Sequence, residues 1–186
     1  YNSDSLRACI TKRRDHFRAL VTTLPLALME TKVPKAEVQA VEAEIFALIP
    51  DELKSTVEVL WDFAEGPEDW KEGIAFIHTG GWSAVELEKP ALLCGRALLV
   101  RNDELLIIFV YCKYRGFRSV DTGETLRQKE DDLTLFETEF LEFVAACRDY
   151  ADSNRLLMGI AGDFNVSAAG DHHLEVKSTT DGVYEA

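Results

Sequence analysis

An acidic residue and a carboxamide follow an apolar run in the last quarter of the sequence. The run covers residues 156–161, and Gly162, Asp163, Phe164 and Asn165 come directly after it. Side chains alternate along a strand, so Asp163 and Asn165 should project the same way where the strand ends. A carboxylate can orient or deprotonate water, and a carboxamide can hydrogen-bond a phosphate. This tetrapeptide therefore indicates a hydrolytic site, while a simple Asx turn would use the same residue types.

Three further polar side chains stand at the ends of apolar runs, namely Asn2, Glu30 and Tyr111. If these runs are neighbouring strands, the side chains meet Asp163 at one rim, where sheet proteins commonly bind ligands. Glu30 supplies a hard carboxylate that suits Mg²⁺, which takes one or two protein carboxylates and keeps several waters. We therefore predict that Glu30 and Asn2 hold Mg²⁺ or Mn²⁺. A solvated strand end for Glu30 and a half-buried aromatic at Tyr111 are the simpler alternatives.

The elements that must position these residues alternate between helical and β patterns. Helical spacing of apolar residues predicts helices over residues 10–22, 35–48 and 127–150. Apolar or alternating runs predict strands over residues 24–30, 56–61, 73–79, 83–88 and 156–161, and a hairpin that joins 96–100 to 105–111. Hairpins mix with crossovers, and the helices have one apolar face each. This pattern predicts an α/β (α+β) fold, a two-sheet sandwich of mixed strands with outer helices.

Composition and charge limit the partners. The chain has 186 residues, is 47% hydrophobic and has a formal net charge of −13 at pH 7, which argues against attraction of its whole surface to nucleic acid. Arg115 and Arg118 lie in the loop after Tyr111, and we predict that they contact a nucleic-acid backbone. The basic cluster that begins at Lys12 is interpreted as the solvated face of a helix.

The cysteines and the absence of long apolar runs bear on location. The four cysteines are widely spaced and form no CxxC pair, so we predict buried free thiols in a reducing compartment. No stretch reaches the length of a transmembrane span, and no signal peptide is visible. We therefore expect an intracellular protein, nuclear or cytoplasmic, with no membrane partner. Because the first residue is Tyr1 and not Met, we expect the chain to begin inside a longer product.

Taken in order, the motifs resemble those of the endonuclease/exonuclease/phosphatase superfamily. They are Tyr-Asn-Ser-Asp-Ser-Leu-Arg-Ala at residues 1–8, Met-Glu-Thr-Lys at 29–32, Val-Tyr at 110–111 and Gly-Asp-Phe-Asn at 162–165. The set is similar in particular to abasic-site nucleases and to the endonuclease domains of non-LTR retrotransposons, and it covers essentially the whole chain. One departure is that Leu-Met precedes Glu30 where the family frequently has Leu-Gln.

The resemblance implies a function and roles for the motif residues. It implies a Mg²⁺-dependent phosphodiester hydrolase that acts on DNA, with RNA as a second possible substrate. In this reading Tyr111 contacts the phosphate near the leaving group, Asp163 activates the water and Asn165 binds the phosphate. Lys32 orients Glu30 or adds positive potential.

The resemblance also implies strands that this sequence lacks. Family members continue with further strands and a terminal Asp-His pair, whereas this sequence ends at Ala186. Asp171 and His172 follow Asn165 too closely to be that pair. We therefore expect one partial domain over residues 1–186, whose own activity is open. The alternatives are a phosphomonoesterase or phospholipase of the same superfamily, and a non-catalytic nucleic-acid-binding or scaffold module.

Overall fold

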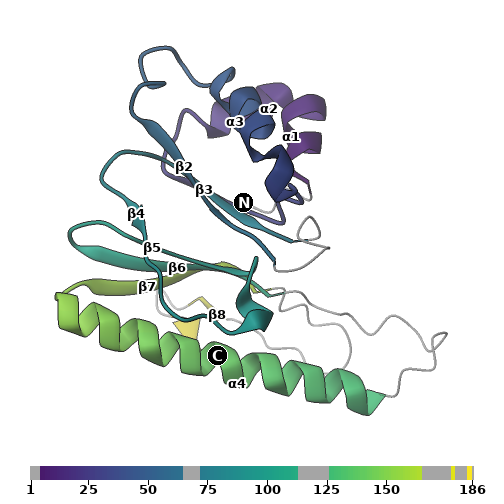
Figure 1. Cartoon of the computed structure of the whole chain (residues 1–186), viewed down its shortest axis with the longest axis vertical. Helices are drawn as coiled ribbons and strands as arrows, with labels where there is room; N and C mark the ends of the chain where they lie inside the picture. Colours follow the sequence, from purple (N-terminus) through teal and green to yellow (C-terminus); the bar gives the residue numbers. More distant parts are fainter. Residues whose placement is uncertain (1–4, 65–71, 113–125, 165–176, 179–183, 186) are drawn as a thin grey trace.

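A computed structural model describes residues 5–64, 72–112, 126–164, 177–178 and 184–185, with side chains described within 5–64, 72–112 and 137–164. Over these residues the fold is mixed α+β, with two main sheets and four α-helices. Figure 1 shows the sheets facing each other, with three helices outside one sheet and one long helix outside the other. The predicted arrangement of two sheets with outer helices is thereby confirmed at this level.

The first sheet has three antiparallel strands and is covered by the N-terminal helices. Its strand order is β1-β3-β2, with β1 at Leu26–Met29, β2 at Val57–Asp62 and β3 at Ile74–Thr79. The covering helices are α1 (Leu6–Lys12), α2 (Arg14–Leu20) and α3 (Val38–Phe46), the last preceded by the 3₁₀ turn η1 (Lys35–Glu37). Phe17, Val41 and Ile45 are completely buried in one cluster with Leu28 and Ile77. Apolar burial between helices and sheet therefore holds this layer together.

The second sheet combines a hairpin with a parallel crossover. Its order is β4-β5-β6-β7, with β4 at Ser83–Ala84, β5 at Ala97–Arg101, β6 at Leu105–Tyr111 and β7 at Leu157–Asp163. Helix α4 (Leu126–Asn154) joins β6 to the parallel strand β7 and packs on the outer face through Phe143, Cys147 and Ala151. The 3₁₀ turn η3 (Ala91–Leu93) precedes β5, and β8 (Lys177–Ser178) pairs separately with β9 (Tyr184–Glu185).

Aromatic side chains fill the space between the two sheets. The ring of Phe76 on β3 lies with its centroid 5.0 Å from that of Phe109 on β6 and 5.4 Å from that of Trp82. Ile74 and Leu98 belong to the same buried cluster. This central layer fixes the sheets relative to each other, so residues at the strand ends of both sheets are held at one rim.

The structure corrects three sequence-based boundaries. The predicted helix 10–22 is two helices, interrupted at Arg13 with φ −124° and ψ 39°. The first begins earlier, at Leu6, whose amide donates to the carbonyl of Thr31. The predicted strand 83–88 is reduced to β4, although Val85 and Leu87 still pack on the core between α4 and the second sheet. Alternate side chains in residues 83–88 are partly buried, which gives the sequence a strand-like pattern. The backbone pairs with β5 as a strand only at β4. The last strand includes Asp163 and does not stop at residue 161.

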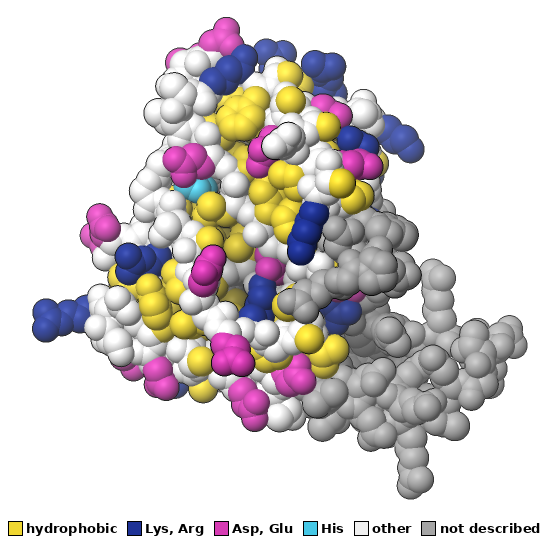
Figure 2. Space-filling model, viewed as in Figure 1, with side chains coloured by type: hydrophobic (Ala, Val, Ile, Leu, Met, Phe, Trp, Pro, Cys, Tyr) yellow, Lys and Arg dark blue, Asp and Glu magenta, His cyan; other side chains and the backbone are white. Residues whose placement is uncertain are grey.

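Charge is unevenly distributed over the surface. Acidic side chains are prominent on the lower part of the molecule in Figure 2, where α4 lies in Figure 1, and dark blue Lys and Arg side chains gather at the top. Among the described side chains of α4, the exposed acids Glu137, Glu142, Asp149 and Asp152 outnumber the single exposed cation Arg148. The net charge of −13 therefore does not describe every face equally.

The buried imidazole of His78 makes stability depend on pH. This side chain is fully buried on β3, stacks on Phe76 and lies 3.9 Å from Glu58 through Nε2. Burial lowers the pKa of His78 below 6.5, and Glu58 offsets this only in part. Because the unfolded chain then binds the proton more readily, the free energy of unfolding should fall as pH drops below 6.5. Denaturant titrations above and below that pH should show the loss.

The His78 contribution can be isolated with two variants. The substitution His78→Gln should reduce the difference in unfolding free energy between the two pH values, and His16→Gln, at an exposed position, is the comparison variant. An unaltered pH dependence in His78→Gln would show that other groups cause it.

Candidate active site

Strand ends from both sheets meet at one rim. Glu30 follows β1 directly, and Tyr111 and Asp163 are the last residues of the parallel neighbours β6 and β7, where they stand opposite each other in register. The Tyr111 hydroxyl donates a hydrogen bond of 2.5 Å to Oε1 of Glu30. The amide of Cys112 donates to the Asp163 carbonyl at 2.8 Å and extends the pairing. The predicted convergence of Glu30, Tyr111 and Asp163 is therefore observed.

The backbone around Glu30 is held in an unusual conformation. Glu30 and Lys32 have φ values of 54° and 52°, in the left-handed region that side chains other than glycine rarely adopt. Three backbone bonds fix the turn: Ser5 donates to the Glu30 carbonyl, Leu6 donates to the Thr31 carbonyl and Thr31 donates to the Gly73 carbonyl. Such strain persists only where surrounding structure enforces it, and it concentrates at functional sites. The turn after β1 therefore presents Glu30 in one fixed direction.

Burial, together with nearby negative charge, favours the protonated phenol of Tyr111. Burial raises the pKa of Tyr111 well above 10, and the hydrogen bond to Glu30 and the charges of Glu30, Asp163 and Glu72 raise it further. At neutral pH the hydroxyl is therefore a hydrogen-bond donor and not a phenolate nucleophile. Lys32 adds positive charge nearby, with Nζ 3.9 Å from Oε1 of Glu30.

Two residues of this rim, Glu72 and Arg96, were not found from the sequence. Arg96 donates from Nε at 2.5 Å and from a terminal nitrogen at 2.7 Å to the two carboxylate oxygens of Glu72. Both side chains are mostly buried, and the Arg96 carbonyl accepts the Tyr111 amide at 2.8 Å. Glu72 and Arg96 precede strands, whereas Glu30, Tyr111 and Asp163 close them. In an antiparallel sheet the neighbouring strands begin at the same rim, and Glu72 and Arg96 stand at such beginnings.

A conservative substitution at Arg96 should weaken the contact with Glu72 and keep the positive charge at this position. Arg96→Lys keeps the charge and loses the two-pronged geometry, so we expect the free energy of unfolding to fall by about 1.5–3 kcal/mol. Denaturant unfolding measures this change, and the exposed Arg18→Lys supplies the control. If both variants lose the same stability, the paired bond to Glu72 is not the cause.

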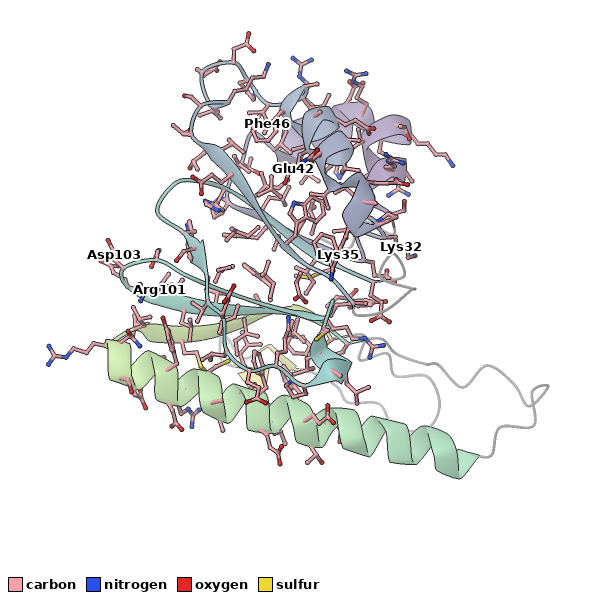
Figure 3. All side chains as sticks on the ribbon, in the orientation of Figure 1. Lys32, Lys35, Glu42, Phe46, Arg101 and Asp103 are labelled. Atoms are coloured by element: carbon pink, nitrogen blue, oxygen red, sulfur yellow. The ribbon has the colours of Figure 1, made fainter. Side chains whose placement is uncertain are left out.

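The remaining predicted site residues lie outside the described part of the chain. They are Asn2, Asn165, Arg115 and Arg118. Lys32 is described, and Figure 3 shows it with Lys35 at one end of the first sheet, away from the hairpin turn that carries Arg101 and Asp103. The rim and that turn thus mark opposite ends of the sandwich.

The donors at the rim are compatible with Mg²⁺ chemistry. In the ranges that the structure describes, no group of three or more His, Cys, Asp and Glu side chains is arranged to hold a metal ion. Mg²⁺ does not require such a cage, because it commonly binds through one or two carboxylates and keeps its waters. Glu30 and Asp163 are two carboxylates of the right type at this rim. The chemistry of this donor set fits the ion.

A cleft opens beside Asp163. Its volume is about 380 Å³, and it lies between β1 and the end of β7, with these lining residues: Pro25, Leu26, Ala27, Met29, Phe109, Ala161, Gly162, Asp163 and Phe164. Most of the lining residues have apolar side chains, and the Asp163 carboxylate is the charged group among them. A ligand placed here would contact the edge strands of both sheets.

No protein-family profile and no curated protein matches the chain. Within the described ranges, no helix combines the length and the apolar character that crossing a membrane requires.

Proposed function

We propose that this chain is a Mg²⁺-dependent phosphodiester hydrolase of the endonuclease/exonuclease/phosphatase type that acts on DNA. The observation that carries the proposal is the 2.5 Å hydrogen bond between Tyr111 and Glu30, residues 81 positions apart in the sequence and on different sheets. Each belongs to one of the ordered motifs that resemble this superfamily. Asp163, from a third motif, ends the strand beside Tyr111. Two facing sheets with outer helices are compatible with such a fold.

Each described rim residue has a chemical task in this proposal. Glu30 would hold Mg²⁺, with Asn2 assigned to the same task by its motif. When held there, Mg²⁺ would supply neutralisation of the charge on the phosphoryl oxygens. Asp163 orients or deprotonates the attacking water, and the protonated Tyr111 donates a hydrogen bond to the phosphate near the leaving oxygen. Lys32 keeps Glu30 oriented and adds positive potential where the phosphate approaches.

Nicking of supercoiled plasmid tests the proposal. The purified chain should convert supercoiled DNA to the open-circular form with Mg²⁺, and EDTA should stop the conversion. The Asp163→Asn variant should nick at least about 10²-fold more slowly, since a positioned acid or base contributes that much or more. Asp149→Asn, at an exposed position on α4, is the matched control. Nicking that survives in Asp163→Asn would refute the assigned site.

The cleft beside Asp163 favours one second candidate. A volume of about 380 Å³ suits a small ligand better than a duplex, so a phosphomonoesterase of the same superfamily is the alternative. Release of inorganic phosphate from small phosphoesters, without plasmid nicking, would favour it. Retained DNA affinity without either activity would instead favour a binding module.

A further inference from the structure

We propose that the exposed face of α1 and α2 binds a nucleic-acid backbone. We call this face the basic surface and define it by Lys12, Arg13, Arg14 and Arg18, all of which are exposed. The choice of nucleic acid as the polyanion rests on the proposed function. The charge and geometry of the surface do not depend on it.

The basic surface differs in sign from the rest of the chain. The first 35 residues contain seven of the 20 lysines and arginines but only three of the 33 acids. On α1 and α2 themselves, Asp15 is the one acidic residue. A helix face that serves only solubility usually mixes both signs, as the described part of α4 does with its acids and Arg148. The basic surface is therefore a local positive region on an acidic protein.

Its cations are not engaged in ion pairs within the described ranges. Arg7, on the same helix, shows the contrast, because it forms a 2.5 Å ion pair with Glu37. The four residues of the basic surface have no such pair there. Buried Phe17 and Val21 fix α2 against the first sheet, so its basic side chains are held outward. Figure 2 shows Lys and Arg side chains gathered in this region of the molecule.

The basic surface is connected to the candidate active site through α1. Helix α1 begins where the amides of Ser5 and Leu6 donate to the carbonyls of Glu30 and Thr31. Its seven residues span about 10 Å at about 1.5 Å per residue. Successive phosphates of one DNA strand rise by about 3.4 Å along the axis, so the interruption at Arg13 lies about three base pairs from Glu30. A long substrate can reach both places, whereas a small phosphoester can reach only one.

The exposure of Lys12, Arg13 and Arg14 agrees with the predicted solvated helix face, and the proposal adds a binding function to that face. Four phosphate contacts would release condensed counterions and make binding strongly dependent on salt. The basic surface would contribute affinity and substrate length preference, while the chemistry remains at Glu30 and Asp163.

Fluorescence anisotropy with a labelled DNA duplex, in EDTA so that no cleavage occurs, tests this inference. The test variant is Lys12→Glu/Arg13→Glu/Arg14→Glu/Arg18→Glu. The control is Lys54→Glu/Arg101→Glu/Arg148→Glu/Arg155→Glu, which changes the net charge equally at other positions. We expect the test variant to bind at least about tenfold more weakly and to lose about 3–4 units of the slope of log affinity against log salt. The control should change both quantities much less.

Several outcomes would overturn the inference. Equal losses in the test and control variants would mean that only net charge matters, and unchanged binding in the test variant would exclude the surface. Binding of the wild type to vesicles of phosphatidylserine, but not to the duplex, would assign the surface to a membrane. Circular dichroism shows whether each variant is folded, so a loss of binding can be separated from a loss of structure. Where a variant fails to fold, glutamine replaces glutamate at the same positions.

Failure of the proposed function gives a different result. A wild type that binds the duplex with the expected salt slope but never nicks plasmid keeps the basic surface and removes the nuclease assignment. Conversely, the wild type could nick plasmid while the test variant shows the same dependence of DNA affinity on salt as the wild type. That result keeps the nuclease assignment and rules out the basic surface.

Discussion

Replacing Glu30 by Gln is expected to slow plasmid nicking by about 10²–10⁴-fold, because charge stabilisation by a bound cation is worth several kcal/mol and about 1.4 kcal/mol is a factor of ten. The amide oxygen of glutamine can still accept the hydrogen bond that Tyr111 donates, so the local structure should remain. What disappears is the negative charge that faces Lys32 at 3.9 Å and that would attract Mg²⁺ at the proposed site. Nicking rates at increasing Mg²⁺ concentration measure the effect, and the variant should need more Mg²⁺ for any residual activity.

The matched control for this prediction is Glu37→Gln. Glu37 is a nearby acid that pairs with Arg7, but it is about half exposed and takes no part in the contacts of Tyr111. Its substitution should change the nicking rate by less than about threefold, given that exposed ion pairs contribute about 0–1 kcal/mol. A Glu30→Gln protein that nicks at the wild-type rate would remove Glu30 from the proposed site.

Replacing Gly162 by Ala is expected to lower the free energy of unfolding by at least about 3 kcal/mol, at or above the upper end of ordinary overpacking costs. Gly162 stands opposite Val110 in the parallel pairing of β7 with β6. A methyl group at this position would overlap the Val110 carbonyl and lie 2.8 and 2.9 Å from its carbon and nitrogen. Backbone atoms cannot rotate away as a flexible side chain can, so the strand must shift. Urea or thermal denaturation measures the loss.

The same strand supplies the control for Gly162. A methyl group at Gly159 would meet no atom within 4 Å, so Gly159→Ala should change stability by no more than about 0.5 kcal/mol. Equal destabilisation by both substitutions would mean that strand flexibility, and not the approach to Val110, is what matters. Because Asp163 follows Gly162 directly, the first substitution should also displace the candidate catalytic carboxylate.

Local patterns were enough to predict most of the architecture. The hairpin of β5 and β6 was predicted with shifts of at most one residue, because two β-prone runs flank a short polar turn. The length and apolar spacing of α4 likewise predicted a long helix. The interruption at Arg13 was not predicted, since apolar periodicity continues across it. Helix α1 is anchored at its start to the turn after β1, and α2 packs on the first sheet through Phe17; both contacts are distant in sequence.

Only those residues of the candidate site that directly follow an apolar run could be predicted from the sequence. Glu30, Tyr111 and Asp163 were expected together, because each polar residue closes an apolar run, and the described contacts agree. Glu72 and Arg96 carry no comparable mark in the sequence. Their place at the rim follows from the order of strands in the two sheets, which single-strand patterns do not encode.

The hydrogen bond between Tyr111 and Glu30 also has a consequence for folding kinetics. It closes a loop across 81 positions and requires both sheets to be docked, so the chain pays the entropy of that closure before the bond forms. The hairpin of β5 and β6 and the helices of the first layer can each form through nearer contacts. The rim is therefore expected to be among the last features to appear during refolding, later than the secondary structure of either layer.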